Sequence, residues 1–141
     1  MLCRDLMKTD VRCVTPETTI AVAAALMRDE QVGFLPVCDT AGNVLGTITD
    51  RDIAIRVVAE YEPPDRPVDL FMTRDVIACQ AGDSLDTAQE AMAEFQVSRI
   101  LCVDENGLLE GVISLSDIAQ VAGDGAASAT LRNVSAREAR A

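Results

Sequence analysis

The stretch Gly46–Ile53 reads GTITDRDI, and the chain repeats its pattern as GVISLSDI at Gly111–Ile118. Both octets have glycine, any residue, a hydrophobic residue, Ser or Thr, two further residues, Asp and a hydrophobic residue. The match extends outward, because a shift of 65 residues places 11–56 on 76–121 without a gap, with 12 of the 46 pairs identical. The pattern therefore predicts two copies of one supersecondary unit, which together fill most of the 141 residues.

Each copy contains three apolar stretches that predict strands. The first is short, the second is an unbroken apolar run typical of a buried strand, and the third returns after a turn rich in Asp, Asn and Gly. The expected strands are 11–14, 34–38 and 44–49 in the first copy, and 76–79, 100–103 and 108–114 in the second.

Helical periodicity fills the gaps between these strands. We expect the first helix of each copy to be capped by Thr18 or Asp83, and the second to begin near Asp50 or Leu115. The order is therefore β-α-β-β-α, twice. The predicted fold class is α+β, with the two repeats packed about a pseudo-two-fold axis.

A proline-rich stretch separates the copies, because Pro63, Pro64 and Pro67 stop the preceding helix. The Ala-, Ser- and Arg-rich end of the chain lacks a sustained apolar stripe, and we expect it to be frayed or helical only against a partner. The predicted domains are repeat 1 (1–62), linker (63–68), repeat 2 (69–123) and tail (124–141).

Composition excludes several classes of function. The chain has 12 basic and 23 acidic residues, a net charge of −11, and this balance argues against a nucleic-acid partner. It has no histidine, which excludes Ser-His triads and His-ligated zinc. The five cysteines form no C-x-x-C pair, and Cys38 and Cys102 lie in apolar runs, so we interpret them as small hydrophobic residues in a reducing compartment. Without a signal-peptide core or a long apolar stretch, we expect a cytoplasmic protein without a membrane partner.

The octet has two chemical interpretations. Thr49 and Ser114 stand where a helix begins, a place that accepts phosphate, and Asp52 and Asp117 follow in the first turn, where a carboxylate can accept hydrogen bonds from two sugar hydroxyls. Alternatively, Ser or Thr followed three residues later by an acid resembles a capping box, whose only role is to start the helix. Capping explains neither the glycine at the same offset nor the recurrence of the whole octet, although an ancient duplication also explains the recurrence.

The doubled unit resembles the CBS-domain family, whose tandem pair is often called a Bateman module. The resemblance covers roughly residues 5–123, and Leu35–Asp39 resembles the family's Leu-Pro-Val-Val-Asp strand. Leu101 departs from the pattern, since Pro is common there. The resemblance implies an adenosine nucleotide (AMP, ADP or ATP) in each cleft between the repeats, with the hydroxyl on phosphate and the Asp on ribose.

In the family, the base is held by the chain around the first strand of the opposite repeat. This implies that Met7–Val14 faces Ser114 and Asp117, and that Met72–Cys79 faces Thr49 and Asp52. The residues implied to bind nucleotide are Thr49, Arg51, Asp52, Ser114, Ser116, Asp117, Arg99, Met7, Arg12, Cys13, Met72 and Ile77.

An anionic ligand on an acidic protein needs local cations, and Arg12, Arg51, Arg56 and Arg99 are the candidates. Arg99 matches a family position that often holds a phosphate-binding cation, whereas the first copy has Phe34 there, so we expect two unequal clefts. A bridging Mg²⁺ would also offset the ligand's charge.

These observations favour a regulatory module that binds an adenosine nucleotide and signals in trans to an effector protein that the sequence does not identify. Family behaviour implies a homodimer. The alternative is a protein-interaction or dimerisation module whose clefts are degenerate. An enzyme is disfavoured, because Cys13 or Cys79 would have to act as a nucleophile without a histidine to activate it.

Overall fold

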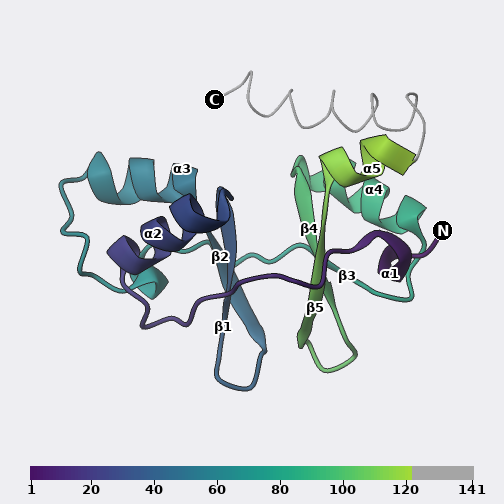
Figure 1. Cartoon of the computed structure of the whole chain (residues 1–141), viewed down its shortest axis with the longest axis horizontal. Coiled ribbons are helices and arrows are strands. Elements are labelled where there is room, and N and C mark those ends of the chain that lie inside the picture. The colour runs from purple at the N-terminus through teal and green to yellow at the C-terminus, as the bar shows by residue number, and fades with distance from the viewer. Residues whose placement is uncertain (122–141) are drawn as a thin grey trace. The chain divides into compact units, whose positions relative to one another are not determined.

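The computed structural model describes residues 1–121, so the predicted tail lies outside the described residues. The chain forms two compact units (Figure 1). One is continuous in sequence, Arg12–Val76, and is called the continuous unit below. The other combines Met1–Val11 with the described chain from Ile77 to Val121, and is called the split unit.

The continuous unit is built on an antiparallel hairpin at the predicted positions. Strand β1 pairs with β2, with Leu35 opposite Ile48. The strand predicted at 11–14 is reduced to one parallel bridge between Val14 and Val37. The helix predicted to begin near Asp50 does so, but it continues as a π-helix. The elements are α2 (Ile20–Glu30), β1 (Phe34–Cys38), β2 (Val44–Thr49), α3 (Asp50–Asp52), the π-helix η1 (Ile53–Val58) and the 3₁₀-helix η2 (Val68–Leu70).

The split unit has a three-stranded sheet of order β3-β4-β5. Strand β3 runs parallel to β4, and β4 runs antiparallel to β5. The strand predicted at 76–79 forms two residues later, because Ala78–Gln80 are the residues that pair with β4. The elements are α1 (Cys3–Leu6), β3 (Ala78–Gln80), α4 (Leu85–Phe95), β4 (Arg99–Val103), β5 (Leu109–Ser114) and α5 (Leu115–Val121).

Each unit has its own hydrophobic core, formed where helices cover one face of its sheet (Figure 1). In the continuous unit, α2 buries three residues at helical spacing against β1 and β2. Equivalent positions of α4 do the same against β4 and β5. The paired residues are Ile20, Ala23 and Met27 in α2, and Leu85, Ala88 and Met92 in α4. Each large side chain buried in this way contributes about 1.5–3 kcal/mol.

The first helix of each copy is capped one residue later than the sequence predicts. Thr19 and Ser84 are the N-caps, each accepting a hydrogen bond from the backbone N–H three residues on. The predicted caps close the preceding turn instead. Thr18 Oγ1 accepts from the N–H of Thr15 at 3.1 Å, and Asp83 Oδ2 accepts from the N–H of Gln80 at 2.8 Å.

The proline-rich stretch packs as part of the continuous unit. The carbonyl of Pro64 accepts the N–H of Ala21, and the carbonyl of Arg66 accepts the N–H of Ile20. These bonds satisfy N–H groups at the start of α2 that have no partner within the helix. The stretch therefore stabilises the start of α2 as well as connecting the repeats.

Each unit is completed by the chain segment that leads into the other repeat. In the split unit, Lys8 and Val112 exchange two backbone hydrogen bonds, of 2.9 and 3.0 Å. In the continuous unit, Thr73 and Thr47 exchange two of 2.9 Å. The two bridges occupy equivalent positions 65 residues apart.

Among residues 1–121, the helices are too short or too polar to span a lipid bilayer.

Candidate functional site

The motif of the continuous unit forms a reciprocal capping box. Thr49 Oγ1 accepts the N–H of Asp52 at 3.0 Å, and Asp52 Oδ2 accepts the N–H of Thr49 at 3.0 Å. The N–H of Asp50 donates to the carbonyl of Gly33. The capping interpretation therefore describes the backbone here. The Thr49 hydroxyl accepts in this arrangement and can still donate its proton to a ligand, since a hydroxyl both accepts and donates.

The motif of the split unit repeats this geometry. Ser114 Oγ accepts the N–H of Asp117 at 3.1 Å, and Asp117 Oδ2 accepts the N–H of Ser114 at 3.0 Å. Ser114 Oγ also lies 2.9 Å from Ser116 Oγ, and either hydroxyl can donate. The N–H of Leu115 donates to the carbonyl of Ser98. Two adjacent hydroxyls therefore flank this helix start, where the continuous unit has one hydroxyl and Arg51.

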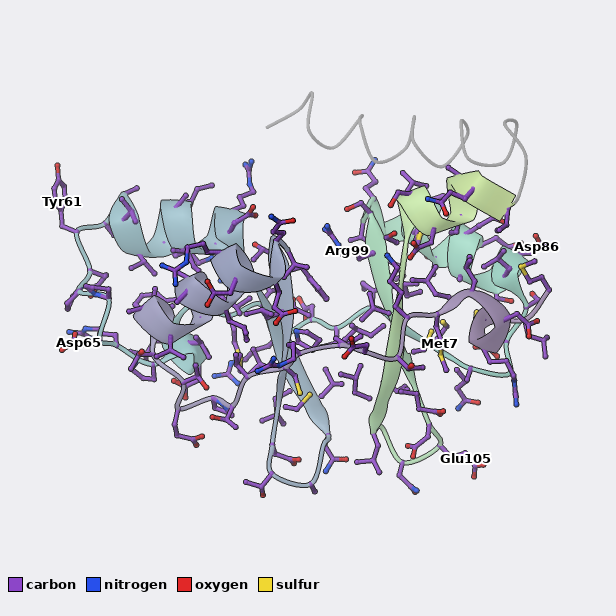
Figure 2. All side chains as sticks on the ribbon, viewed as in Figure 1. Met7, Tyr61, Asp65, Asp86, Arg99 and Glu105 are labelled. Carbon is purple, nitrogen blue, oxygen red and sulfur yellow. The ribbon has the colours of Figure 1, made fainter. Side chains whose placement is uncertain are left out.

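The glycine that begins each octet makes room for the segment that bridges to its strand, which contains Met7 and Lys8 in the split unit and Met72 and Thr73 in the continuous unit and is called the crossing segment below. A Cβ on Gly46 would lie 2.6 Å from the carbonyl oxygen of Thr73 and 3.1 Å from Met72 Sδ. A Cβ on Gly111 would lie 2.9 Å from the carbonyl oxygen of Lys8 and 2.9 Å from Met7 Sδ, and Figure 2 shows Met7 beside β5. The glycines thus bring Met7 and Met72 against the strands that lead into the two motifs.

A cation lies beside each motif aspartate, and the two cations come from different elements. Lys8 Nζ, from the crossing segment, lies 3.2 Å from Asp117 Oδ1. Arg56 Nε, from η1, lies 3.8 Å from Asp52 Oδ1. The guanidinium of Arg56 also donates to the carbonyl of Phe71 at 3.0 Å. Lys8 was not selected from the sequence. Its position directly after Met7, which corresponds to Thr73 after Met72 in the other copy, is the signal that could have identified it.

Asp117 is the buried polar residue of the described core, with 7% of its surface exposed. Burial by itself would raise the pKa of this carboxyl. The hydrogen bonds from Ser114 and the ammonium of Lys8 outweigh burial and lower the pKa of Asp117 below its ordinary 3.8. Asp117 is therefore ionised at neutral pH and can accept further hydrogen bonds.

The remaining predicted site residues divide between the units. Arg12 and Cys13 belong to the continuous unit, whereas Ser114 and Asp117 belong to the split unit. Ile77 belongs to the split unit, whereas Thr49 and Asp52 belong to the continuous unit. Within the continuous unit, Arg12 Nη1 lies 3.3 Å from Glu30 Oε1, and Arg51 is exposed. Arg99 is exposed at the start of β4, opposite Ser114 in the strand register.

The cysteines are free thiols, and four of them are buried. Cys79 Sγ lies 3.6 Å from both Cys3 Sγ and Cys102 Sγ in the core of the split unit. Burial raises the pKa of Cys3 to about 12, and likewise the pKa of Cys38. Protonated, buried thiols behave as small hydrophobic side chains. Within residues 1–121, no group of three or more Cys, Asp or Glu residues is placed to hold a metal ion.

The chain matches the CBS domain family twice, at residues 3–59 and 68–124. A curated relative, the CBS domain-containing protein YhcV of Bacillus subtilis, is 38% identical over 134 residues, which are 94% of each chain. A solved structure of Hypoxic Response Protein I, with two coordinated zinc ions, is 30% identical with a TM-score of 0.78, over 86% of this chain and 98% of that one.

Two further solved structures contain adenosine derivatives and show the likeness of fold. The CBS domain pair of MJ0100, in complex with 5′-methylthioadenosine and S-adenosyl-L-methionine, is 24% identical with a TM-score of 0.78, over 87% of this chain and 96% of that one. CBSX2 in complex with AMP is 22% identical with a TM-score of 0.75, over 86% and 95%. With both repeats matched and the pair fold shared, this chain belongs to the CBS domain family and carries a tandem pair of CBS domains.

Proposed function

We propose that the protein is a regulatory module that binds an adenosine nucleotide of the AMP, ADP or ATP class at its two helix-start motifs and signals in trans to an effector protein. One observation carries the proposal. In both units, a glycine lets a methionine-bearing segment pack against the strand that ends in the motif. An apolar segment therefore packs, in both units, against the strand that leads to a hydroxyl and a carboxylate.

The chemistry at each motif suits a nucleoside phosphate. The hydroxyls of Thr49 and Ser114 would donate to phosphate, and the carboxylates of Asp52 and Asp117 would accept from ribose hydroxyls. Each charge-assisted hydrogen bond contributes about 1.5–3 kcal/mol. The similar folds that contain AMP or S-adenosyl-L-methionine support the adenosine class. Any Mg²⁺ would arrive as the counter-ion of the nucleotide, since the described residues hold no metal-binding group.

Signalling follows only if the nucleotide binds two arrangements of the module with different affinity. The output would then be a surface that a partner protein, or a second copy of the chain, recognises in one arrangement. The proposal is a binding role without catalysis.

The test is thermal unfolding with millimolar AMP, ADP, ATP and S-adenosyl-L-methionine. A ligand at a hundredfold excess over its Kd stabilises the folded state by about 2.7 kcal/mol. We expect the double variant Asp52→Asn with Asp117→Asn to lose this stabilisation, since both ribose acceptors are weakened. The matched control is Asp65→Asn with Asp86→Asn, which removes one exposed carboxylate from each unit (Figure 2) and keeps the shift.

The alternative is a protein-interaction or dimerisation module without a ligand, and the capping boxes favour it. They already engage Thr49, Asp52, Ser114 and Asp117 in starting helices. If the whole panel leaves the melting temperature unchanged while sedimentation shows self-association, the alternative replaces the nucleotide proposal.

A further inference from the structure

We propose that Lys8 makes the motif of the split unit selective for adenosine ligands that carry a phosphate. This inference rests on the proposed function, and it assigns a specificity-determining residue to one of the two motifs. The continuous unit has Thr73 at the equivalent position and lacks this contribution.

The backbone of Lys8 is fixed beside the strand that ends in the motif. Its N–H donates to the carbonyl of Val112 at 2.9 Å, and its carbonyl accepts the N–H of Val112 at 3.0 Å. Val112 lies two residues before Ser114 on β5, so the backbone of Lys8 is anchored two residues along the strand from the residue whose hydroxyl would hold phosphate.

The ammonium group of Lys8 is aimed at the motif. The side chain is 72% exposed, yet Nζ lies 3.2 Å from Asp117 Oδ1, whose side chain is 9% exposed. An ammonium has three donors, and Asp117 engages one of them. The remaining two are held at the motif by this ion pair, where a phosphate could accept them.

The same ion pair disfavours a ligand without phosphate. Ribose hydroxyls that bind Asp117 compete with Lys8 for the Oδ1 oxygen, because Oδ2 already accepts the N–H of Ser114. A ligand that brings a phosphate gives the displaced ammonium a new charged acceptor. A ligand without one leaves the ammonium competing for the carboxylate.

The continuous unit places its cation differently. Thr73 makes the same backbone bridge, with Thr47, but it carries no charge. The cation beside Asp52 is Arg56, at 3.8 Å, and its Nη1 is already engaged by the carbonyls of Phe71 and Met72 at 3.0 and 3.4 Å. Arg56 therefore holds the crossing segment in place, whereas Lys8 is oriented toward the motif.

The experiment compares AMP with adenosine by calorimetric titration of the full chain. Binding to the split unit is isolated in an Asp52→Asn background. There we expect Lys8→Thr to lower the affinity for AMP at least about tenfold, the loss of one charge-assisted hydrogen bond, and to leave the affinity for adenosine unchanged or higher, because the competing ammonium is gone. The control Arg28→Thr removes another exposed cation, on α2, and should leave the AMP-to-adenosine ratio unchanged.

Two further variants keep the inference open to refutation if Lys8→Thr folds poorly. Lys8→Arg keeps the charge and should keep the preference for AMP. Thr73→Lys, measured in an Asp117→Asn background, should raise that preference at the continuous unit. An unchanged ratio in Lys8→Thr, or an equal loss of both ligands, would overturn the role of Lys8 alone. Absence of all binding to the unaltered protein would instead overturn the proposed function.

Discussion

The two helix-start motifs have the same main-chain geometry, but the cation beside the aspartate comes from a different part of each unit. In the split unit, Lys8 of the crossing segment reaches Asp117 on α5. In the continuous unit, Arg56 of η1 reaches back to the crossing segment and only approaches Asp52. Steric demands thus fix the glycine and the backbone bridge in both copies, while the charges around them differ. Four measurements test how far the two units are equivalent.

The largest effect is expected in the cores, where the two units are most alike. Ile48 and Ile113 occupy equivalent positions on β2 and β5, and both are fully buried. Replacement of either by alanine should cost about 2–5 kcal/mol, through lost burial and a cavity. Urea denaturation measures the loss. A cost that differs between the two variants by more than about 2 kcal/mol would show that the cores are not equivalent.

The next effect comes from the glycines. Gly46→Ala and Gly111→Ala should each cost about 1–3 kcal/mol, because the new Cβ meets a backbone carbonyl that cannot move aside alone. We expect the larger cost at Gly46, where the approach is 2.6 Å against 2.9 Å at Gly111. Gly107→Asn is the control, since the turn leaves space around it and Asn tolerates its positive φ of 84°. Equal stability of all three variants would contradict the steric account.

The two motif aspartates, Asp52 and Asp117, should contribute unequally to the free energy of unfolding. Asp117→Asn should cost about 1–2 kcal/mol, since it weakens a charge-assisted bond from Ser114 and leaves the ammonium of Lys8 without its partner. Asp52→Asn should cost less, because Arg56 keeps its bonds to the crossing segment. Chemical denaturation of both, beside Asp65→Asn and Asp86→Asn, gives the comparison. A larger cost at Asp52 would reverse our assignment of the two cations.

The smallest effect is the dependence on pH. The folded pKa of Asp117 lies below its ordinary 3.8, so its stabilising contribution is present above that value. It falls as the pH drops through the folded pKa, because protonation then occurs in both the folded and unfolded states. The difference in stability between the unaltered protein and Asp117→Asn should therefore be constant near neutrality and shrink below about pH 4. A difference that grew with acidification would show that Asp117 is not held ionised.

Local patterns in the sequence predicted much of the fold. The unbroken apolar runs located β1 and β4, because a buried strand must be apolar along its length. Each cap was placed one residue early, because Thr18 and Asp83 are good caps in isolation and the preceding turn engages them instead. The π-helical form of η1 was not predicted, because helical periodicity alone does not distinguish it from an α-helix.

The candidate site was predicted in part. Within each unit the methionine packs beside the glycine of the octet, and the hydroxyl and the aspartate of the same octet cap the next helix. The binding of a nucleotide by these residues stays a prediction. Lys8 could not be selected from composition, since an exposed lysine acquires a role only through the distant strand it crosses. The placement of Arg12 and Cys13 was also beyond local patterns, because the boundary of the compact unit falls at Arg12, inside the stretch predicted as one segment.

The unequal continuity of the two units has a consequence for biosynthesis. All of Arg12–Val76 is synthesised before Ile77 is added, so this half needs no later part of the chain to complete its contacts once it has left the ribosome. Met1–Val11 is synthesised before the rest of its unit, but Lys8 can form its backbone bridge only after Val112 has been added. A single protein thus contains one half that matures early and another whose oldest residues spend most of translation without their strand.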